Sequence, residues 1–166
     1  MKVIIVTGTP GTGKTAVAKR IAKEKGYKYV DVKKIIEENK LKEKYDKKRQ
    51  TYDVDVKKLN IILIKKISEE KSKTQERQSL SGRRKCKAFS CETKGIVIDS
   101  HLSHYLNPRY VDLCIVTKTE LKKLRKRLEK RGYSKNKIRE NLDSEIFDVC
   151  LNEAKDMGHK VKVIKT

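Results

Sequence analysis

The sequence of 166 residues has no tryptophan, only two prolines and no long apolar run. No segment approaches the roughly 18 consecutive apolar residues that a membrane-spanning helix needs. At the N-terminus only four apolar residues separate Lys2 from Thr7, which is too few for the apolar part of a signal peptide. We therefore expect a soluble, cytoplasmic protein without a membrane anchor.

Cysteine is also scarce, with four residues in the chain. Cys86 and Cys91 are separated by four residues, and no second Cys/His pair has the spacing of a zinc finger. Cys114 lies in an apolar, strand-like segment and Cys150 in a helix-like one, so both are expected to be buried thiols. We expect neither a structural metal nor a disulfide.

Negative charge is in the minority. Lysine and arginine number 43 against 22 aspartate and glutamate residues, which gives a net charge of +21. Such an excess suggests a polyanionic partner such as RNA, and equally suits a lysine-rich surface that only keeps a small protein in solution. Recurrent apolar clusters exclude overall disorder, and the length favours one domain, residues 1–166.

Strand-like and helix-like segments alternate along the chain. We predict strands over residues 2–6, 27–30, 96–98, 111–117 and 159–164. Helices are predicted over residues 14–25, 32–44, 56–68, 120–131 and 135–157, with a polar loop over 45–55. This alternation predicts an α/β fold whose parallel sheet is covered by helices on both faces.

Residues 69–94 differ from the rest in composition. They contain eight basic and four acidic residues, with few apolar side chains. We interpret them as an exposed, mobile basic insertion.

The sequence Gly8-Thr-Pro-Gly-Thr-Gly-Lys-Thr15 follows the first predicted strand and precedes the first helix. It matches G-x-x-x-x-G-K-[ST], in which backbone amides and a helix N-terminus surround phosphate oxygens. Lys14 would reach the β- and γ-phosphates of ATP, and the Thr15 hydroxyl would bind Mg²⁺. An ordinary glycine-rich turn is much less consistent with this context.

Asp99 ends the predicted strand 96–98 and is our candidate for holding the Mg²⁺ shell, through water; the alternative is a strand-end turn residue. His101 follows two residues later, where an imidazole could orient or deprotonate water, although a lone loop histidine is often structural. His104 has helical spacing from His101 without a third metal ligand. Asp31 ends the second strand and would face an acceptor or cap the next helix.

A GTPase interpretation is disfavoured. The sequence Thr117-Lys-Thr-Glu120 is similar to the guanine-reading [NT]-K-x-D element, but its acid is glutamate. Leu102 also stands where a glycine would follow Asp99 in such proteins.

These motifs resemble the nucleoside monophosphate kinases, and most closely the adenylate kinase isoenzyme 6 family. The Asp-x-His sequence after the third predicted strand and the Arg-Gly-Tyr sequence near residue 132 are the most specific parts. The resemblance covers most of the chain outside 69–94, through residues 8–15, 26–31, 45–46, 52–55, 99–101, 127–133, 145–147 and 153–154.

The resemblance implies a five-stranded parallel sheet in the order 2-3-1-4-5. It implies a Mg²⁺-dependent adenylate kinase that transfers phosphate reversibly between ATP and AMP, with ATP hydrolysis associated with Asp99 and His101. It further implies an acceptor-binding arm over about 31–54 and a lid over about 130–140 whose Arg131 lies over the phosphates. The residues expected to contact ATP are Gly11, Gly13, Lys14, Thr15, Ala16 and Arg131.

The same family acts in late maturation of the small ribosomal subunit. The resemblance therefore implies a transient contact with a platform ribosomal protein and a possible contact with pre-16S rRNA. Two alternatives remain: a nucleotide-switched assembly ATPase with little kinase activity, and a P-loop kinase for another small acceptor.

Three departures from the family pattern bear on these expectations. Glu37 stands where many adenylate kinases have an acceptor-side arginine, which predicts weak AMP binding. Residues 69–94 are longer than the corresponding link in the family. The sequence stops at Thr166, whereas relatives continue through a helix that shapes the adenine pocket, so we expect loose base selectivity or a partner on that face.

Overall fold

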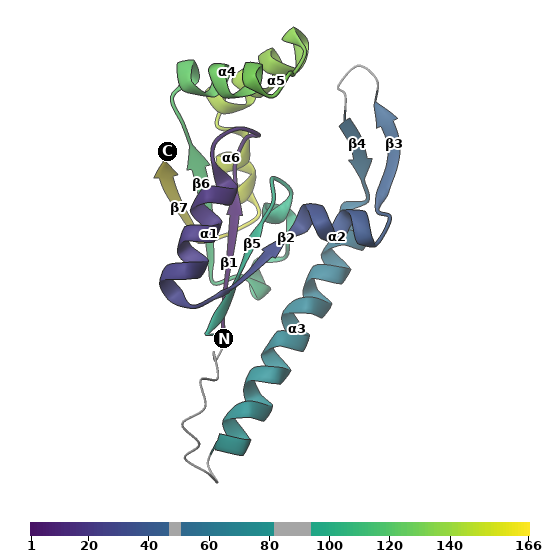
Figure 1. Ribbon diagram of the computed structural model, residues 1–166, viewed down its shortest axis with the longest axis vertical. Coiled ribbons are helices and arrows are strands. Elements are labelled where there is room, and N and C mark those ends of the chain that lie inside the picture. The colour runs from purple at the N-terminus through teal and green to yellow at the C-terminus, as the bar shows by residue number, and fades with distance from the viewer. Residues whose placement is uncertain (47–50, 82–93) are drawn as a thin grey trace.

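A parallel sheet of five strands forms the centre of the computed structural model, which describes residues 1–46, 51–81 and 94–166 (Figure 1). Its order is β2-β5-β1-β6-β7. Counted among the strands of this sheet alone, that order is 2-3-1-4-5, so the expected topology is confirmed. The strands are β1 (Lys2–Thr7), β2 (Lys28–Asp31), β5 (Gly95–Asp99), β6 (Leu113–Lys118) and β7 (Val161–Lys165).

One face of the sheet is covered by α1 (Lys14–Lys25). Side chains alternate along a strand, so Ile4 and Val6 face α1 while Val3 and Ile5 face the other way. The buried stripe of the helix is Val17, Ala18, Ile21 and Ala22. The helix ends at Gly26, whose left-handed backbone (φ 63°) directs its N–H to the carbonyl of Ala22.

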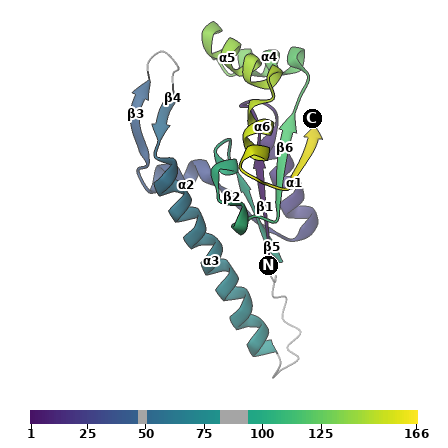
Figure 2. The same ribbon diagram turned by 180° about the vertical axis from the view of Figure 1, so that it is seen from behind.

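The opposite face packs against α2 (Val32–Glu38), the first half of α3 (Val56–Ser81) and α6 (Val149–Asp156). Seen from behind, α6 crosses in front of the sheet (Figure 2), where Ala154 is fully buried. Two short 3₁₀ turns, η1 (Ser103–Tyr105) and η2 (Pro108–Tyr110), connect β5 to β6.

A β-hairpin replaces part of the predicted helix 32–44 and of the predicted loop 45–55, so both predictions were wrong in detail. Its strands are β3 (Lys42–Asp46) and β4 (Thr51–Val54), paired antiparallel. The helix α2 stops early because Lys40 adopts a left-handed backbone (φ 52°) and Leu41 turns back into the core. The hairpin extends beyond the ends of the central strands (Figure 1).

Helix α3 continues thirteen residues past the predicted end at Ser68, to Ser81. The first part of the segment read as a mobile insertion is therefore helical. Glu70 is buried there, and its Oε1 accepts a hydrogen bond from Nζ of Lys28 at 2.6 Å. Cys86 and Cys91 lie outside the described residues.

The helices α4 (Leu121–Lys130) and α5 (Lys135–Ile146), together the helical arm, pack around Leu124, Leu128 and Ile138. The predicted helix 135–157 is interrupted at Asp148, whose backbone is left-handed (φ 54°) and whose carboxylate pairs with Lys118. The helical arm and the hairpin both rise beyond the carboxyl ends of the strands (Figure 1). In the described part of the chain no helix is long and apolar enough to cross a membrane.

Candidate phosphate-binding site

The P-loop, residues 8–15, connects β1 to α1 at the carboxyl edge of the sheet. Gly8 and Gly11 have φ values of 137° and 97°, which side chains rarely permit. A Cβ atom on Gly8 would lie 2.5 Å from the carbonyl oxygen of Thr117, so the loop can pass this close to β6 only with glycine there. Gly13, with φ 87°, is the N-cap of α1.

Two threonines fix this loop to neighbouring elements. The Thr9 hydroxyl donates to Oε2 of Glu145 at 2.7 Å, and the other carboxylate oxygen accepts from the Thr119 amide at 2.9 Å. The Thr12 hydroxyl lies 2.7 Å from that of Thr117 on β6. Because Glu145 is only 6% exposed, its carboxylate links the P-loop, the residue that follows β6, and α5 largely out of contact with bulk water.

Lys14 begins α1 and folds back over its own loop. Its Nζ donates to the carbonyl oxygens of Gly8 and Thr9 at 2.7 and 2.9 Å. Burial lowers the pKa of this ammonium to about 8. It therefore remains largely charged at neutral pH and can exchange two backbone acceptors for phosphate oxygens.

Asp99 lies at the end of β5, beside the first turn of α1. Its Oδ2 accepts hydrogen bonds from the Thr15 hydroxyl at 2.6 Å and from the Tyr29 hydroxyl at 3.0 Å. Burial and the Asp99 carboxylate together raise the pKa of Tyr29, so this phenol stays a donor. The hydroxyl and the carboxylate that the sequence assigned to Mg²⁺ are thus brought together; Ala16 follows, exposed on the same helix turn.

His101 follows Asp99 in the turn between β5 and η1, with a side chain open to solvent. Neighbouring protein atoms nevertheless remove part of its hydration, and this desolvation, together with the positive charge of Lys14, lowers the pKa of the imidazole. The ring is therefore neutral at pH 7, the form that can accept a proton.

Arg131 caps the C-terminus of α4, and its side chain is exposed. It is near enough to Lys14 for its charge to contribute to the lowered pKa of that lysine. The arginine of α4 that contacts the P-loop is Arg127, one helical turn earlier, which donates to the carbonyl oxygen of Gly11 at 3.1 Å.

Several further predictions can be placed. The side chain of Asp31 accepts a hydrogen bond from the Lys33 amide at 2.9 Å. Of the two roles expected for Asp31, the structure therefore shows the helix cap. Glu37 pairs with Lys42 of the hairpin at 3.5 Å. Cys114 is fully buried and Cys150 half-buried, both as free thiols.

Sequence reasoning missed Tyr29, Arg127 and Glu145 as parts of this site. A signal existed for Arg127, because it precedes Arg131 by four residues and so shares its helix face. Tyr29 and Glu145 lie in segments that carry the family resemblance, 26–31 and 145–147, but no spacing predicted their contacts, since their partners are distant in sequence.

Comparisons with known proteins agree with this geometry. The family model described as AAA domain matches residues 4–148. A relative from Methanosarcina mazei, whose name assigns it to the adenylate kinases, is 37% identical over 161 residues, which are 97% of this chain and 76% of the relative. The adenylate kinase isoenzyme 6 homolog of Schizosaccharomyces pombe is 35% identical over 153 residues, covering 92% and 74%.

Among solved structures, shikimate kinase from Acinetobacter baumannii in complex with shikimate is 12% identical, with a TM-score of 0.53. The similarity covers all of this chain and 85% of that one, and it concerns the fold alone.

The parallel sheet and its P-loop define the P-loop kinase fold. The similarity to relatives named as adenylate kinases makes the protein a phosphotransferase of that class. Within that class, the chain belongs to the adenylate kinase isoenzyme 6 family.

Proposed function

We propose that this protein transfers the terminal phosphate of ATP to AMP, with water as a second acceptor. The observation that carries the proposal is the 2.6 Å hydrogen bond between the Thr15 hydroxyl and the Asp99 carboxylate at the P-loop. Lys14, which supplies the ammonium group, directly precedes Thr15 in the sequence. A P-loop kinase needs these three groups around the phosphates. The names of the relatives from Methanosarcina mazei and Schizosaccharomyces pombe support the choice of an adenylate acceptor.

The residues fit Mg²⁺ as the cofactor. Thr15 and Asp99 offer hard oxygen ligands, which Mg²⁺ prefers, and it commonly uses one or two protein ligands besides substrate phosphates and water. When bound, the ion would neutralise charge on the β- and γ-phosphate oxygens. We propose that Thr15 holds it directly and that Asp99 holds it through water.

The cationic side chains would stabilise the transferred group. Lys14 leaves the carbonyl oxygens of Gly8 and Thr9 for phosphate oxygens, while Arg131 lies over the phosphates from the helical arm. Arg127 already contacts the loop and would hold the arm against it. Such positioning and charge stabilisation supply most of the catalysis in phosphoryl transfer.

The hairpin and α2 would form the acceptor arm. Tyr45 and Tyr52 are exposed, with ring centroids 4.8 Å apart, and Nζ of Lys42 lies 5.3 Å from the centroid of the Tyr52 ring. An aromatic pair beside a cation suits a nucleotide, because bases stack on rings and phosphates bind ammonium groups. Lys42 would thus provide the positive charge that Glu37 does not, by exchanging its ion pair with Glu37 for a phosphate of the acceptor.

Hydrolysis would use His101. A neutral imidazole beside the terminal phosphate can orient and deprotonate water. Replacing it in His101→Ala should slow ATP hydrolysis roughly 100-fold, the lower range for a general base, while transfer to AMP changes little. Equal rates of hydrolysis in parent and variant would remove this role from His101.

The proposed kinase activity is tested by measuring ADP formation from ATP with AMP, GMP, CMP, UMP or shikimate, with Mg²⁺ and with excess chelator. AMP should accelerate ADP formation most, and chelator should abolish the acceleration. Acceleration by shikimate alone would indicate another small acceptor. No acceleration by any nucleotide would contradict the nucleotide kinase proposal.

A second candidate is a nucleotide-switched factor in late small-subunit maturation that contacts pre-16S rRNA and a platform ribosomal protein. One observation favours it: residues 120–131 contain seven basic and two acidic residues, and most of these lie exposed on α4 beside the P-loop. Binding to an rRNA fragment should then weaken steeply between 50 and 200 mM salt. Binding that hardly changes over that range would contradict the electrostatic contact.

A further inference from the structure

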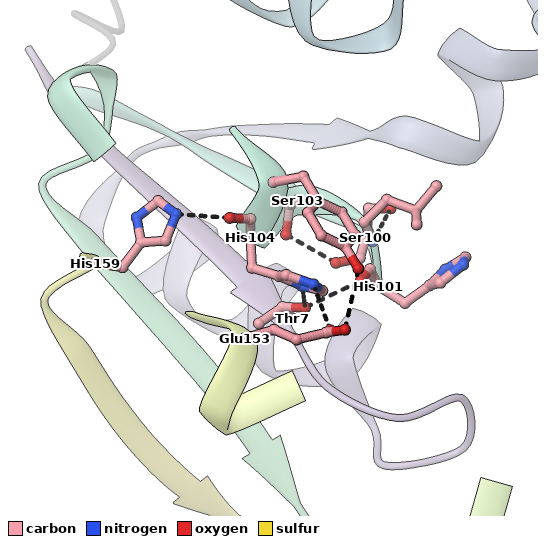
Figure 3. A network of polar contacts seen from close by, with 9 residues as sticks. Thr7, Ser100, His101, Ser103, His104, Glu153 and His159 are labelled. Carbon is pink, nitrogen blue, oxygen red and sulfur yellow. Dashed lines mark hydrogen bonds and ion pairs between the residues drawn. The ribbon is translucent and has the colours of Figure 1, made fainter. Parts of the chain in front are cut away.

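A buried polar network lies under the turn that carries His101 (Figure 3). Thr7 of β1 and Ser103 of η1 are fully buried, and His104 of η1 is 2% exposed. Glu153 reaches His104 from α6. The proposed chemistry does not use His104, yet burying an imidazole with polar partners from two other elements, β1 and α6, requires an explanation.

The contacts form a chain that ends at His101. Nδ1 of His104 lies 2.8 Å from the Thr7 hydroxyl oxygen, which lies 3.3 Å from the carbonyl oxygen of His101. On the other side of the ring, Nε2 is 3.0 Å from Oε2 of Glu153. That last contact is close but bent, without hydrogen-bond alignment, so it acts mainly through charge.

Because the Thr7 hydroxyl has only one proton to donate, this series of contacts can act as a switch. A threonine hydroxyl has one proton, so Thr7 can donate either to Nδ1 of His104 or to the carbonyl of His101. The Glu153 carboxylate favours a proton on Nε2, because a bare nitrogen lone pair there would be repelled. Neutral His104 therefore accepts the Thr7 proton on Nδ1, whereas doubly protonated His104 donates to Thr7 and directs the hydroxyl to His101.

We propose that Thr7, His104 and Glu153 are positioning residues for His101, which act by selecting the acceptor of the Thr7 hydroxyl. Protonation of His104 fixes the His101 carbonyl to β1, beside the P-loop. Loss of that proton releases the carbonyl. The functional consequence rests on the role proposed above for His101, whereas the exchange of the hydrogen bond does not.

The groups around His104 set the pH range of the exchange. Burial lowers the pKa of His104, Glu153 on α6 opposes that effect, and the neighbouring His159 adds to it. Nε2 of His159 lies 2.8 Å from the backbone carbonyl oxygen of His104, and the Tyr105 hydroxyl donates to Oε1 of Glu153 at 3.2 Å. The exchange is therefore expected below pH 6.5, the ordinary pKa of histidine.

A nuclear magnetic resonance titration of the full chain tests the exchange without any activity measurement. In the parent, the carbonyl ¹³C shift of His101 should move with the same midpoint as the His104 ring. In Thr7→Val this movement should vanish, while Thr7→Ser should retain it. Ser103→Ala, which removes a neighbouring buried hydroxyl, is the matched control and should retain it too. A His101 carbonyl that does not follow the ring in the parent, or still follows it in Thr7→Val, would overturn the proposal.

A kinetic experiment tests the consequence. The ratio of parent to Thr7→Val hydrolysis rates should be roughly fivefold below the His104 midpoint, as for one ordinary hydrogen bond, and near one above pH 7. KM for ATP should not change, and Thr7→Val should have no further effect when His101 is alanine. A ratio independent of pH would contradict positioning. If His101→Ala hydrolyses ATP at the parental rate, the role of His101 fails while the titration still decides the hydrogen-bond exchange.

Discussion

The P-loop edge of the sheet and the β3–β4 hairpin hold their side chains in opposite ways. At the P-loop, Thr9 and Thr12 are buried and bonded to other elements, through Glu145 and Thr117. On the hairpin, Tyr45 and Tyr52 are exposed, and their rings contact each other across the two strands. This difference indicates that the P-loop edge is preformed, whereas the hairpin, which we propose as the acceptor arm, is adaptable.

The largest effect should come from Lys14. Lys14→Met removes the charge that would hold the phosphates, and ATP turnover should fall by about 10²–10³, as when one preorganised donor is lost. Steady-state turnover measures this. Lys23→Met, at an exposed position in the last turn of the same helix, should behave as the parent. Similar losses of turnover in both variants would show that Lys14 acts only through the net positive charge of the protein.

The next effect concerns stability. Glu145→Ala leaves the Thr9 hydroxyl and the Thr119 amide without their buried acceptor, which should lower the free energy of unfolding by about 2–4 kcal/mol. Urea denaturation monitored by circular dichroism measures it. Glu24→Ala removes an exposed carboxylate from α1, and should change stability by less than about 0.5 kcal/mol. If Glu145→Ala lost no more stability than Glu24→Ala, the result would contradict a preformed P-loop edge.

A smaller effect is expected from pH. Because burial places the pKa of Lys14 at about 8, raising the pH through 8 removes the proton and weakens ATP binding. Affinity at pH 9 should be roughly tenfold lower than at pH 7. Calorimetric titration measures it, and Lys14→Met should lack this loss. The same lowered pKa means that, between about pH 8 and 10.5, the unfolded chain binds more protons than the folded one. The contribution of Lys14 to the free energy of unfolding therefore increases as the pH rises through that range.

The smallest effect on stability should come from the hairpin. Tyr45→Ala and Tyr52→Ala should each change the free energy of unfolding by less than about 0.5 kcal/mol. They should raise KM for AMP roughly fivefold through the loss of stacking, with KM for ATP unchanged. A loss of stability comparable with that of Glu145→Ala would show that the hairpin belongs to the rigid core.

The sheet could be predicted from the sequence because its strands are short apolar runs, and the P-loop because its glycines and Lys14 occur in one contiguous segment. The hairpin could not. Lys42–Asp46 has no apolar alternation, so its pairing depends on tertiary context. The end of α2 was missed since Lys40 is an unusual residue for a left-handed backbone.

The candidate site could be predicted only where its residues are near in sequence or follow a strand. Lys14, Thr15 and Asp99 met these conditions, and the structure places Thr15 beside Asp99. Tyr29 and Glu145 did not, because their partners Asp99 and Thr9 are 70 and 136 residues away. Long-range packing decides such contacts.

The fate of the labelled terminal phosphate of ATP tests the central claim most directly. With ATP labelled at the γ-phosphate, Mg²⁺ and AMP, the label should appear in the β-phosphate of newly formed ADP faster than in inorganic phosphate. Lys14→Met should slow its appearance in both. Label found in inorganic phosphate alone, at a rate that AMP does not alter, would contradict phosphate transfer to a nucleotide.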